Sequence, residues 1–260
     1  MPQGHIARKR FGQNFLSDPN IIRKIITAIA PTPEQHVVEI GPGLGALTVP
    51  LLAACGHIDV VEIDRDLIAR LKETYKPEQI TIHEGDALKF DFSVLPAPLR
   101  VVGNLPYNIS TPLLFHFANY AERVRDMTFM LQKEVVQRMV AEPDSEAYGR
   151  LSVMLQYRFN MAHLFDVPPG AFQPAPKVTS AIVYLQPKPA EQCSCRDEIL
   201  FGKIVTAAFG QRRKTLRNTL REWMSDADFA VLGISPQARG ETLSVEDYVR
   251  MTDHLCLRTV

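Results

Sequence analysis

The sequence predicts an α/β fold with a mostly parallel sheet of about seven strands, followed by a small all-helical domain. Short β-branched runs alternate with helix-like segments in the first half of the chain, at 36–40, 58–63, 79–83 and 99–104. This alternation is typical of right-handed β-α-β units. A proline-containing stretch without apolar periodicity follows at 186–195, and only helical patterns lie beyond it. We therefore expect two domains, 1–187 and 196–260.

Each element has its own local signal. Asp18 is placed to cap a helix through 21–30, which Pro31 and Pro33 would end. After the fourth strand, further strands are expected at 127–131, 164–169 and 181–186, with helices at 133–141 and 150–159. Beyond the linker we expect helices at 199–209, 214–224 and 244–257, the last with a capping box of Ser244 and Asp247.

Composition excludes several classes of protein. With 260 residues, 46% of them hydrophobic, the chain can bury a real core. The 29 basic and 29 acidic residues give no global cationic field, so any phosphate contact must come from local clusters, at Arg8–Arg10 and within 212–221. No apolar run is long enough to span a bilayer, and no signal peptide is evident, so we expect a cytoplasmic protein without membrane contact. The four cysteines are scattered, and we expect no metal site or disulfide.

A glycine turn follows the first predicted strand, in the run Glu39-Ile40-Gly41-Pro42-Gly43-Leu44-Gly45. Open α/β sheets bind ligands at this edge, and glycines such as Gly41 and Gly43 let the backbone approach a ligand closely. The spacing is G-x-G-x-G and not the G-x-G-x-x-G that seats a dinucleotide pyrophosphate. Taken alone, the motif is equally compatible with a plain tight turn.

Two acidic residues follow the next strands. Glu62 ends the second strand, 21 residues after Gly41, where a carboxylate can accept hydrogen bonds from both ribose hydroxyls of an adenosine. Asp86 follows the third strand and is placed to accept from the amino group of an adenine. The alternatives are a solvated charge at a strand end for Glu62 and a helix cap for Asp86.

Asn104-Leu105-Pro106-Tyr107 has the residue types needed to handle an amine. The Asn104 side-chain oxygen and the Leu105 carbonyl can both accept hydrogen bonds from an amino group. Pro106 fixes the turn, and Tyr107 can stack on a base. Since the lone pair of an aromatic amine is delocalised into its ring, two acceptors aimed at its hydrogens would favour a more tetrahedral, nucleophilic nitrogen. The alternative is a capped turn with a buried tyrosine.

Seven motifs together closely resemble the bacterial small-subunit ribosomal RNA adenine dimethyltransferases, the family associated with kasugamycin sensitivity. They run in order as GQNFL from Gly12, EIGPGLGALT, VEIDRDL, GDAL, NLPYNIS, AFQPAPKVTSA and FGQRRKTLRNTL. The resemblance implies a Rossmann-like class I methyltransferase domain with S-adenosylmethionine as methyl donor. It also implies transfer of methyl groups to the 6-amino groups of two adjacent adenosines in a hairpin loop near the 3′ end of 16S rRNA. The roles that follow are RNA binding, rRNA processing and ribosome biogenesis.

The resemblance also assigns roles to single residues. Asn14 and Leu16 match the family's N-terminal cofactor contacts. Gly41 and Gly43 match its glycine turn, Glu62 its ribose contact and Asp86 its adenine contact. Asn104 is expected to contact both the cofactor and the target amine. Phe172 matches the aromatic residue that stacks on the flipped target adenine opposite Tyr107, although a phenylalanine beside prolines is commonly plain packing. Arg212, Arg213, Lys214 and Arg217 are expected to face RNA, where a solvated helix face is the alternative.

The sequence leaves three other functions open. The protein could act as a non-catalytic ribosome-assembly factor, against which the intact Asn104, Tyr107 and Glu62 argue. It could be a large-subunit rRNA adenine methylase of the antibiotic-resistance type, although the QRRKTLRN segment favours the small-subunit enzyme. A nicotinamide-dependent dehydrogenase is disfavoured by the glycine spacing. Because nothing in the sequence suggests an interface, we expect a monomer.

Overall fold

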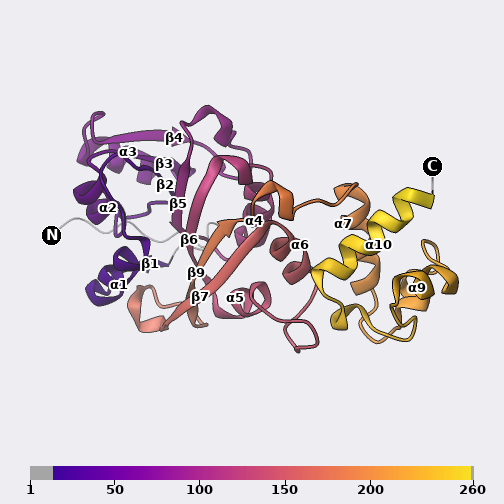
Figure 1. Cartoon of the computed structure of the whole chain (residues 1–260). Coiled ribbons are helices and arrows are strands. Elements are labelled where there is room, and N and C mark those ends of the chain that lie inside the picture. The colour runs from indigo at the N-terminus through magenta and orange to yellow at the C-terminus, as the bar shows by residue number, and fades with distance from the viewer. Residues whose placement is uncertain (1–13, 259–260) are drawn as a thin grey trace. The chain divides into compact units, whose positions relative to one another are not determined.

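The computed structural model describes residues 14–258 (Figure 1). Their contacts divide them into two compact units. The first unit runs up to Val136 and includes Met161–Pro187, and the second combines Gln137–Asn160 with the chain from Lys188 onward. The predicted cluster Arg8–Arg10, and Gly12 of the GQNFL motif, lie outside the described residues.

A seven-stranded sheet forms the first unit, in the order β4-β3-β2-β5-β6-β9-β7. Neighbouring strands from β4 to β6 pair in parallel, whereas β9 pairs antiparallel with β6. This confirms the predicted mostly parallel sheet. The strands are β2 (His36–Ile40), β3 (Ile58–Glu62), β4 (Ile80–Glu84), β5 (Leu99–Asn104), β6 (Val124–Gln132), β7 (Phe159–Val167) and β9 (Ser180–Pro187). A separate antiparallel pair joins β1 (Phe15–Leu16) to β8 (Phe172–Gln173).

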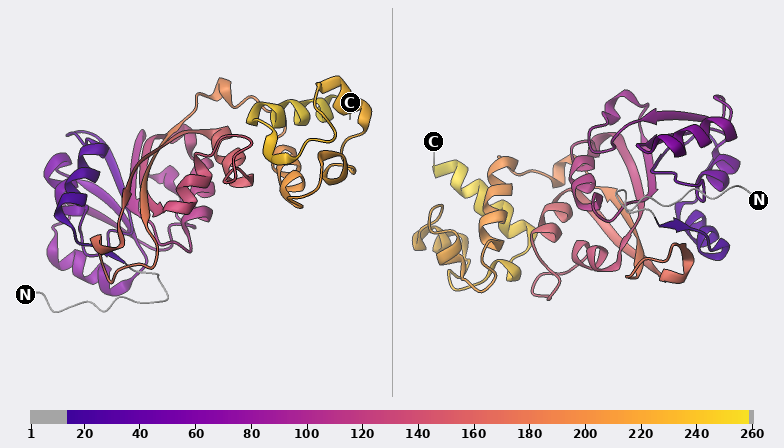
Figure 2. Two further views of the ribbon diagram at one scale, coloured as in Figure 1. Left: turned by 90° about the horizontal axis from the view of Figure 1, so that it is seen from below. Right: turned by 180° about the vertical axis from the view of Figure 1, so that it is seen from behind.

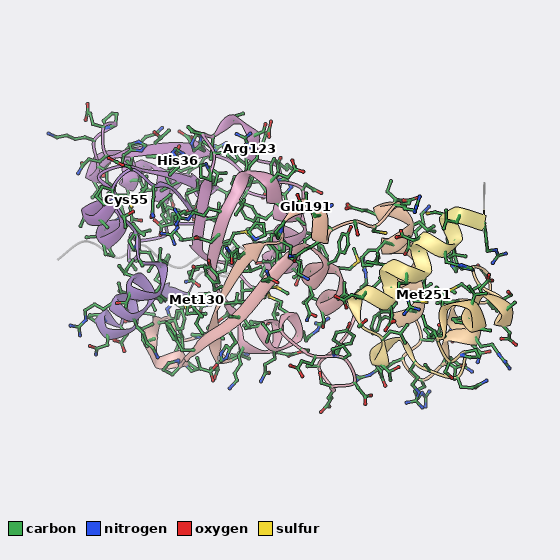
Figure 3. All side chains as sticks on the ribbon, viewed as in Figure 1. His36, Cys55, Arg123, Met130, Glu191 and Met251 are labelled. Atoms are coloured by element: carbon green, nitrogen blue, oxygen red, sulfur yellow. The ribbon has the colours of Figure 1, made fainter. Side chains whose placement is uncertain are left out.

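Helices cover both faces of this sheet (Figure 2). One face packs against α1 (Pro19–Ile29), α2 (Thr48–Cys55) and α3 (Arg65–Thr74), in a buried cluster that includes Ile25, Leu51, Leu71 and Met130, the last of which is labelled in Figure 3. The other face packs against α4 (Ser110–Ala118), where the rings of Phe117 and Phe129 lie 5.7 Å apart. Met130 and its neighbour Phe129 point to opposite faces because side chains alternate along a strand.

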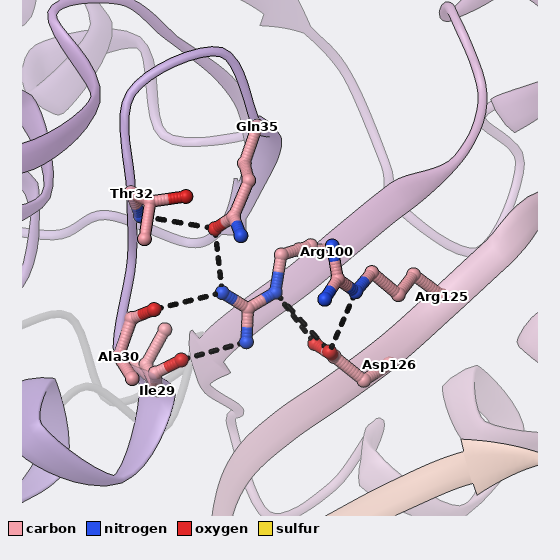
Figure 4. Close-up of polar contacts among 7 residues, drawn as sticks. All are labelled: Ile29, Ala30, Thr32, Gln35, Arg100, Arg125 and Asp126. Carbon is pink, nitrogen blue, oxygen red and sulfur yellow. Dashed lines mark hydrogen bonds and ion pairs between the residues drawn. The ribbon is translucent and has the colours of Figure 1, made fainter.

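Helix α1 begins and ends at polar anchors. Asp18 caps it as predicted, its carboxylate accepting from the backbone N–H groups of Asn20 and Ile21. At the other end, the buried Arg100 side chain of β5 donates to the carbonyls of Ile29 and Ala30 and pairs with Asp126 of β6 at 2.9 Å (Figure 4). Carbonyls at a helix end lack intrahelical partners, so Arg100 joins this helix to the sheet.

The second unit has a helical core of its own. Helix α6 (Arg150–Arg158), α7 (Glu198–Phe209) and α10 (Val245–Arg258) contribute buried residues to one cluster, among them Val153, Phe201, Tyr248 and Met251, which is labelled in Figure 3. The Ser244–Asp247 capping box before α10 is present, as predicted. Residues 137–160 pack here, whereas the predicted domain boundary assigned them to the first domain.

The predicted helix over 214–224 is wrong in its extent. Only Leu216–Thr219 is helical (α8), and turns follow up to a new cap at Ser225, which begins α9 (Asp226–Leu232). Leu216, Leu220 and Met224 are all buried, so the helical spacing of apolar residues is satisfied by one short helix and a turn. The reciprocal Ser225–Asp228 capping box then begins the next helix, α9.

The remaining elements are short. They are α5 (Lys133–Met139) and the short 3-10 helices η2 (Phe92–Val94), η3 (Ala121–Arg123), η4 (Pro169–Ala171), η5 (Ala190–Gln192) and η6 (Gly240–Thr242). Between residues 14 and 258, no helix is both long enough and apolar enough to cross a membrane.

Candidate active site

A pocket lies within the first unit, at the carboxyl ends of its parallel strands. Its lining comes from five segments, at 14–16, 39–47, 61–67, 85–87 and 104–109. The first segment contains β1, and the other four begin at the carboxyl ends of β2, β3, β4 and β5. Ligands of open parallel sheets bind at this edge, so the topology alone brings the predicted glycine, acidic and amide residues together.

The glycine turn after β2 forms one wall of the pocket. Gly41 and Gly43 have φ values of +63° and +59°, in the left-handed region that favours glycine. A Cβ atom on Gly43 would lie 3.2 Å from the ring of Phe15, which is itself part of the lining. The left-handed φ values and the nearby Phe15 ring therefore both favour glycine in this turn. Without side chains, its backbone is open to a ligand.

Glu62 sits at the end of β3 with its carboxylate fixed by backbone groups. Its Oε1 accepts hydrogen bonds from the N–H groups of Ile63 and Asp64, both at 2.9 Å. Burial raises the pKa of Glu62, and backbone donors, including Gly43 N–H, oppose this rise. A carboxylate held this way has lone pairs left for hydroxyl groups in the pocket, which fits the predicted ribose contact.

Glu39, the residue before the glycine turn, is a site residue to which the sequence patterns gave no role. Its side chain is buried and lines the pocket, and it accepts a 2.6 Å hydrogen bond from Thr48 Oγ1. Burial raises its pKa to about 7, against the lowering effect of Thr48 and with a further rise from nearby Glu62. Its only sequence signal is an acidic residue at an otherwise apolar strand end.

Asp86 lines the pocket after β4 and also has a structural role. Its Oδ1 accepts from the N–H of Leu88 at 2.9 Å, as in a capped turn. The predicted alternative of a cap is thus present, and it orients the carboxylate at the pocket. The second carboxylate oxygen provides an acceptor of the kind an adenine amino group needs.

Asn104, the last residue of β5, is joined to the N-terminal segment. Its Nδ2 donates to the backbone carbonyl of Asn14 at 3.0 Å. Just before it, Gly103 pairs with Ile40, and a Cβ there would lie 2.7 Å from the Ile40 carbonyl oxygen. The close β2–β5 approach places Asn104 beside the glycine turn, while Asn14 and Leu16 line the same pocket.

Tyr107 follows in the turn between β5 and α4 and is half-buried in the pocket lining. Its hydroxyl lies 2.7 Å from Ser180 Oγ, at the start of β9. Burial raises the pKa of Tyr107, and the Ser180 hydrogen bond acts against this rise. The hydroxyl is therefore neutral at physiological pH, and its ring can act as an uncharged stacking surface.

Phe172 is placed differently from the other predicted residues. It lies in β8, where it is the register partner of Leu16, and it is buried in the cluster beneath α1. It does not belong to the pocket lining in this structure. Its packing against Leu16 matches the alternative considered from the sequence, and its stacking on a target base stays a prediction.

The basic residues that are predicted to face RNA belong to the second unit and do not line this pocket. Arg212, Arg213, Lys214 and Arg217 are all exposed. Arg217 forms a bidentate ion pair with Asp226, and the Arg212 side chain donates a hydrogen bond to the Glu146 carbonyl. The four side chains lie at the surface, and their contact with RNA stays a prediction.

Comparison with known proteins identifies the family of the chain. The family model for ribosomal RNA adenine dimethylase matches residues 4–256. The chain belongs to the ribosomal RNA adenine dimethylase family. A curated relative in this group, the ribosomal RNA small subunit methyltransferase A of Aromatoleum aromaticum, is 72% identical over 98% of this chain and 96% of its own length.

Solved structures agree with this dimethylase assignment. A dimethyladenosine transferase from Plasmodium falciparum has a TM-score of 0.82 and 26% identity, over 95% of this chain and 98% of its own. The 23S rRNA methyltransferase ErmE has a TM-score of 0.69 over 94% of this chain and 100% of its own, but at 24% identity it shows only a shared fold. The chain is accordingly an rRNA methyltransferase with the predicted Rossmann-like fold, which excludes the dehydrogenase alternative.

Proposed function

We propose that this dimethylase acts on 16S rRNA in the small ribosomal subunit. Its product would be two adjacent dimethyladenosines in a hairpin loop near the 3′ end, made in the cytoplasm by a monomeric enzyme during subunit biogenesis. The observation that carries the proposal is one pocket that combines a glycine turn and Glu62 with the Asn104–Tyr107 turn. A donor site and an amine site are thereby adjacent.

The residues of the pocket fit S-adenosylmethionine. Gly41 has a left-handed φ, and a Cβ built on it meets nothing within 4 Å, so its backbone borders open space. Glu62 and Asp86 offer acceptors for the hydroxyl and amino groups of an adenosine, and Asn14 and Leu16 close the side of the pocket near Asn104. When bound, S-adenosylmethionine would supply an electrophilic methyl carbon that an amine nitrogen can attack directly, with the methyl–sulfur bond breaking and S-adenosylhomocysteine as the leaving group.

Asn104 and Leu105 supply acceptors for the target amine. Because Asn104 Nδ2 donates to Asn14, its Oδ1 is the amide atom that can accept a hydrogen bond from the amine. Leu105 N–H donates to the Met130 carbonyl at 3.2 Å, which fixes this peptide and the direction of the next carbonyl. These acceptors stabilise the positive charge that develops on nitrogen as it forms the new bond, after which a proton leaves to solvent.

This chemistry uses positioning and charge stabilisation, with neither a metal ion nor a covalent enzyme intermediate. Protons leave readily from a cationic nitrogen, so a strong general base is not required. Tyr107 offers a ring on which an extruded adenine can stack, as enzymes that act on a base edge require. Arg212, Arg213 and Lys214 would contact phosphates of the folded RNA.

The substrate is tested by incubating the protein with labelled S-adenosylmethionine and either undermethylated small subunits or large subunits. Nucleoside analysis of each RNA then locates the label. We expect dimethyladenosine in the small-subunit RNA alone. Label in large-subunit RNA alone would favour the resistance-methylase alternative, and no label in either RNA would favour a non-catalytic assembly factor.

A further inference from the structure

The hydroxyl of Tyr107 is held by a residue that is distant in sequence and outside the Asn104–Tyr107 turn. Ser180 Oγ lies 2.7 Å from this hydroxyl, 73 residues further along the chain. Ser180 is fully buried, whereas Tyr107 is half-buried and faces the pocket. The serine therefore reaches the tyrosine from the protein interior, on the side away from the ligand space.

Both partners are anchored through their backbones. Ser180 is the first residue of β9, in register with Gln132 of β6, and the adjacent Thr179 carbonyl accepts from Lys133 N–H at 3.0 Å. The Tyr107 carbonyl accepts from Ser110 Oγ at 3.1 Å, at the start of α4. The tyrosine is thus held at its backbone by one serine and at its hydroxyl by another.

The ring of Tyr107 is well placed for the target base. Phe15 and Tyr107 are aromatic residues in the lining, but Phe15 packs against Gly43 on the donor side. Phe172 is buried beside Leu16. Tyr107 is two residues beyond the Leu105 carbonyl and three beyond Asn104, so its ring orientation decides whether a base can stack while its amine reaches those acceptors.

We infer that Ser180 is a positioning residue that acts through the Tyr107 hydroxyl to hold this ring at the stacking orientation. The inference rests on the proposed function, because it concerns the adenine side of the same pocket. Loss of the hydrogen bond would free the ring to turn within the pocket. A misoriented stacking surface lowers the rate of the chemical step without altering donor contacts at Glu62 and the glycine turn.

A double-mutant cycle tests this inference, using full-length protein, S-adenosylmethionine and undermethylated small subunits. Ser180→Ala and Tyr107→Phe each remove the hydrogen bond, and each is expected to lower kcat by about three- to tenfold, the range for one neutral hydrogen bond. Because both act on one contact, the double variant should be no slower than either single variant. The KM for S-adenosylmethionine should stay within about twofold of wild type in every variant.

The controls separate positioning from structure. Ser152→Ala removes another fully buried serine hydroxyl, which donates to the Arg138 carbonyl in the second unit, and its kcat should match wild type. Ser180→Thr keeps the hydroxyl and should recover most of the rate. If Ser180→Ala fails to fold, the cycle is run with Ser180→Cys, which keeps the size but donates weakly.

Several outcomes would overturn the inference. Multiplicative losses in the double variant would mean that the two residues act independently, and a wild-type kcat for Ser180→Ala would remove the role altogether. A loss that appears only in the KM for the donor would place Ser180 on the cofactor side. Failure of wild-type protein to form dimethyladenosine would reject the proposed function itself, which is a separate result.

Discussion

The side-chain amide of Asn104 donates a 3.0 Å hydrogen bond to the backbone carbonyl of Asn14. This contact ties the end of β5 to the segment before β1 and fixes which atom of the amide is presented as an acceptor. Asn104→Ala removes that acceptor, so we expect kcat to fall on the order of 100-fold, comparable to the loss of one preorganised polar group in other enzymes. Single-turnover methylation of undermethylated small subunits measures this rate.

A matched control for this variant is Asn20→Ala, which changes an exposed asparagine in the first turn of α1. It should methylate at the wild-type rate. Wild-type single-turnover rates for Asn104→Ala would show that the amide is not an acceptor in the chemical step.

Glu62 is expected to control affinity for the donor. Its carboxylate is oriented by the Ile63 and Asp64 N–H groups. Glu62→Ala would remove the two charge-assisted contacts that we propose it makes to the ribose hydroxyls. Calorimetric titration with S-adenosylhomocysteine should show Kd weakened by about 10- to 100-fold or more. The exposed Glu73→Ala, on α3, is the control. Equal affinity of Glu62→Ala and wild type would exclude the ribose contact.

Glu39 predicts a particular pH dependence of stability. Its pKa is about 7 in the folded protein against 4.5 for an ordinary glutamate, so the folded state holds this proton more tightly. The stabilisation is present below pH 4.5 and is lost as pH rises through 7, with a magnitude on the order of 3 kcal/mol.

Glu39→Gln removes this titration while keeping an acceptor for Thr48. Urea unfolding at a series of pH values should show wild type losing stability relative to Glu39→Gln between pH 4.5 and 7. Because Glu62 titrates in both proteins, the difference between them reports the titration of Glu39 together with its coupling to Glu62. Parallel stability curves would mean that Glu39 titrates normally.

The buried Arg100–Asp126 pair is expected to stabilise the first unit. Asp126→Asn leaves the Arg100 charge buried without its counter-ion, so unfolding free energy should fall by about 3 kcal/mol or more. Arg125→Ala removes an exposed cation 3.9 Å from the same carboxylate and should cost less than about 1 kcal/mol. Equal losses in denaturant unfolding would contradict a special role for the buried pair.

The exposed cations of the second unit predict a salt-dependent effect. Replacing Arg212, Arg213 and Lys214 by glutamine should weaken binding to small subunits and reduce the slope of log K against log salt by up to about 1 per lost phosphate contact. Arg217→Gln should have a smaller effect, because Arg217 is already paired with Asp226. An unchanged slope in the triple variant would show that these side chains make no phosphate contacts and form an ordinary solvated surface.

Most of the first unit follows from local sequence signals. Short β-branched strands, and helices such as Pro19–Ile29 with its Asp18 cap, are specified by a few neighbouring residues, so these elements could be predicted without knowledge of their packing partners. The glycine turn, Glu62 and Asn104 were predictable for a related reason. Parallel topology brings strand ends together regardless of the details of packing.

The remaining features depend on long-range contacts. The inferred role of Ser180 depends on its contact with Tyr107, which is 73 residues away in sequence. The raised pKa of Glu39 depends on its burial. Neither feature is visible in a sequence motif. Phe172 has a motif match, yet its side chain packs on Leu16 because β8 pairs with β1. The short α8 likewise is followed by turns that still bury Leu220 and Met224, so an apolar pattern that continues in sequence does not show where the helix ends.

The most direct test of the central claim is mass analysis of nucleosides from undermethylated small subunits after incubation with the protein and S-adenosylmethionine, with the Asn104→Ala variant run alongside. The account predicts dimethyladenosine at two adjacent positions near the 3′ end of 16S rRNA with wild type, and little with the variant. Unmodified adenosines with wild type, or equal modification by both proteins, would contradict it.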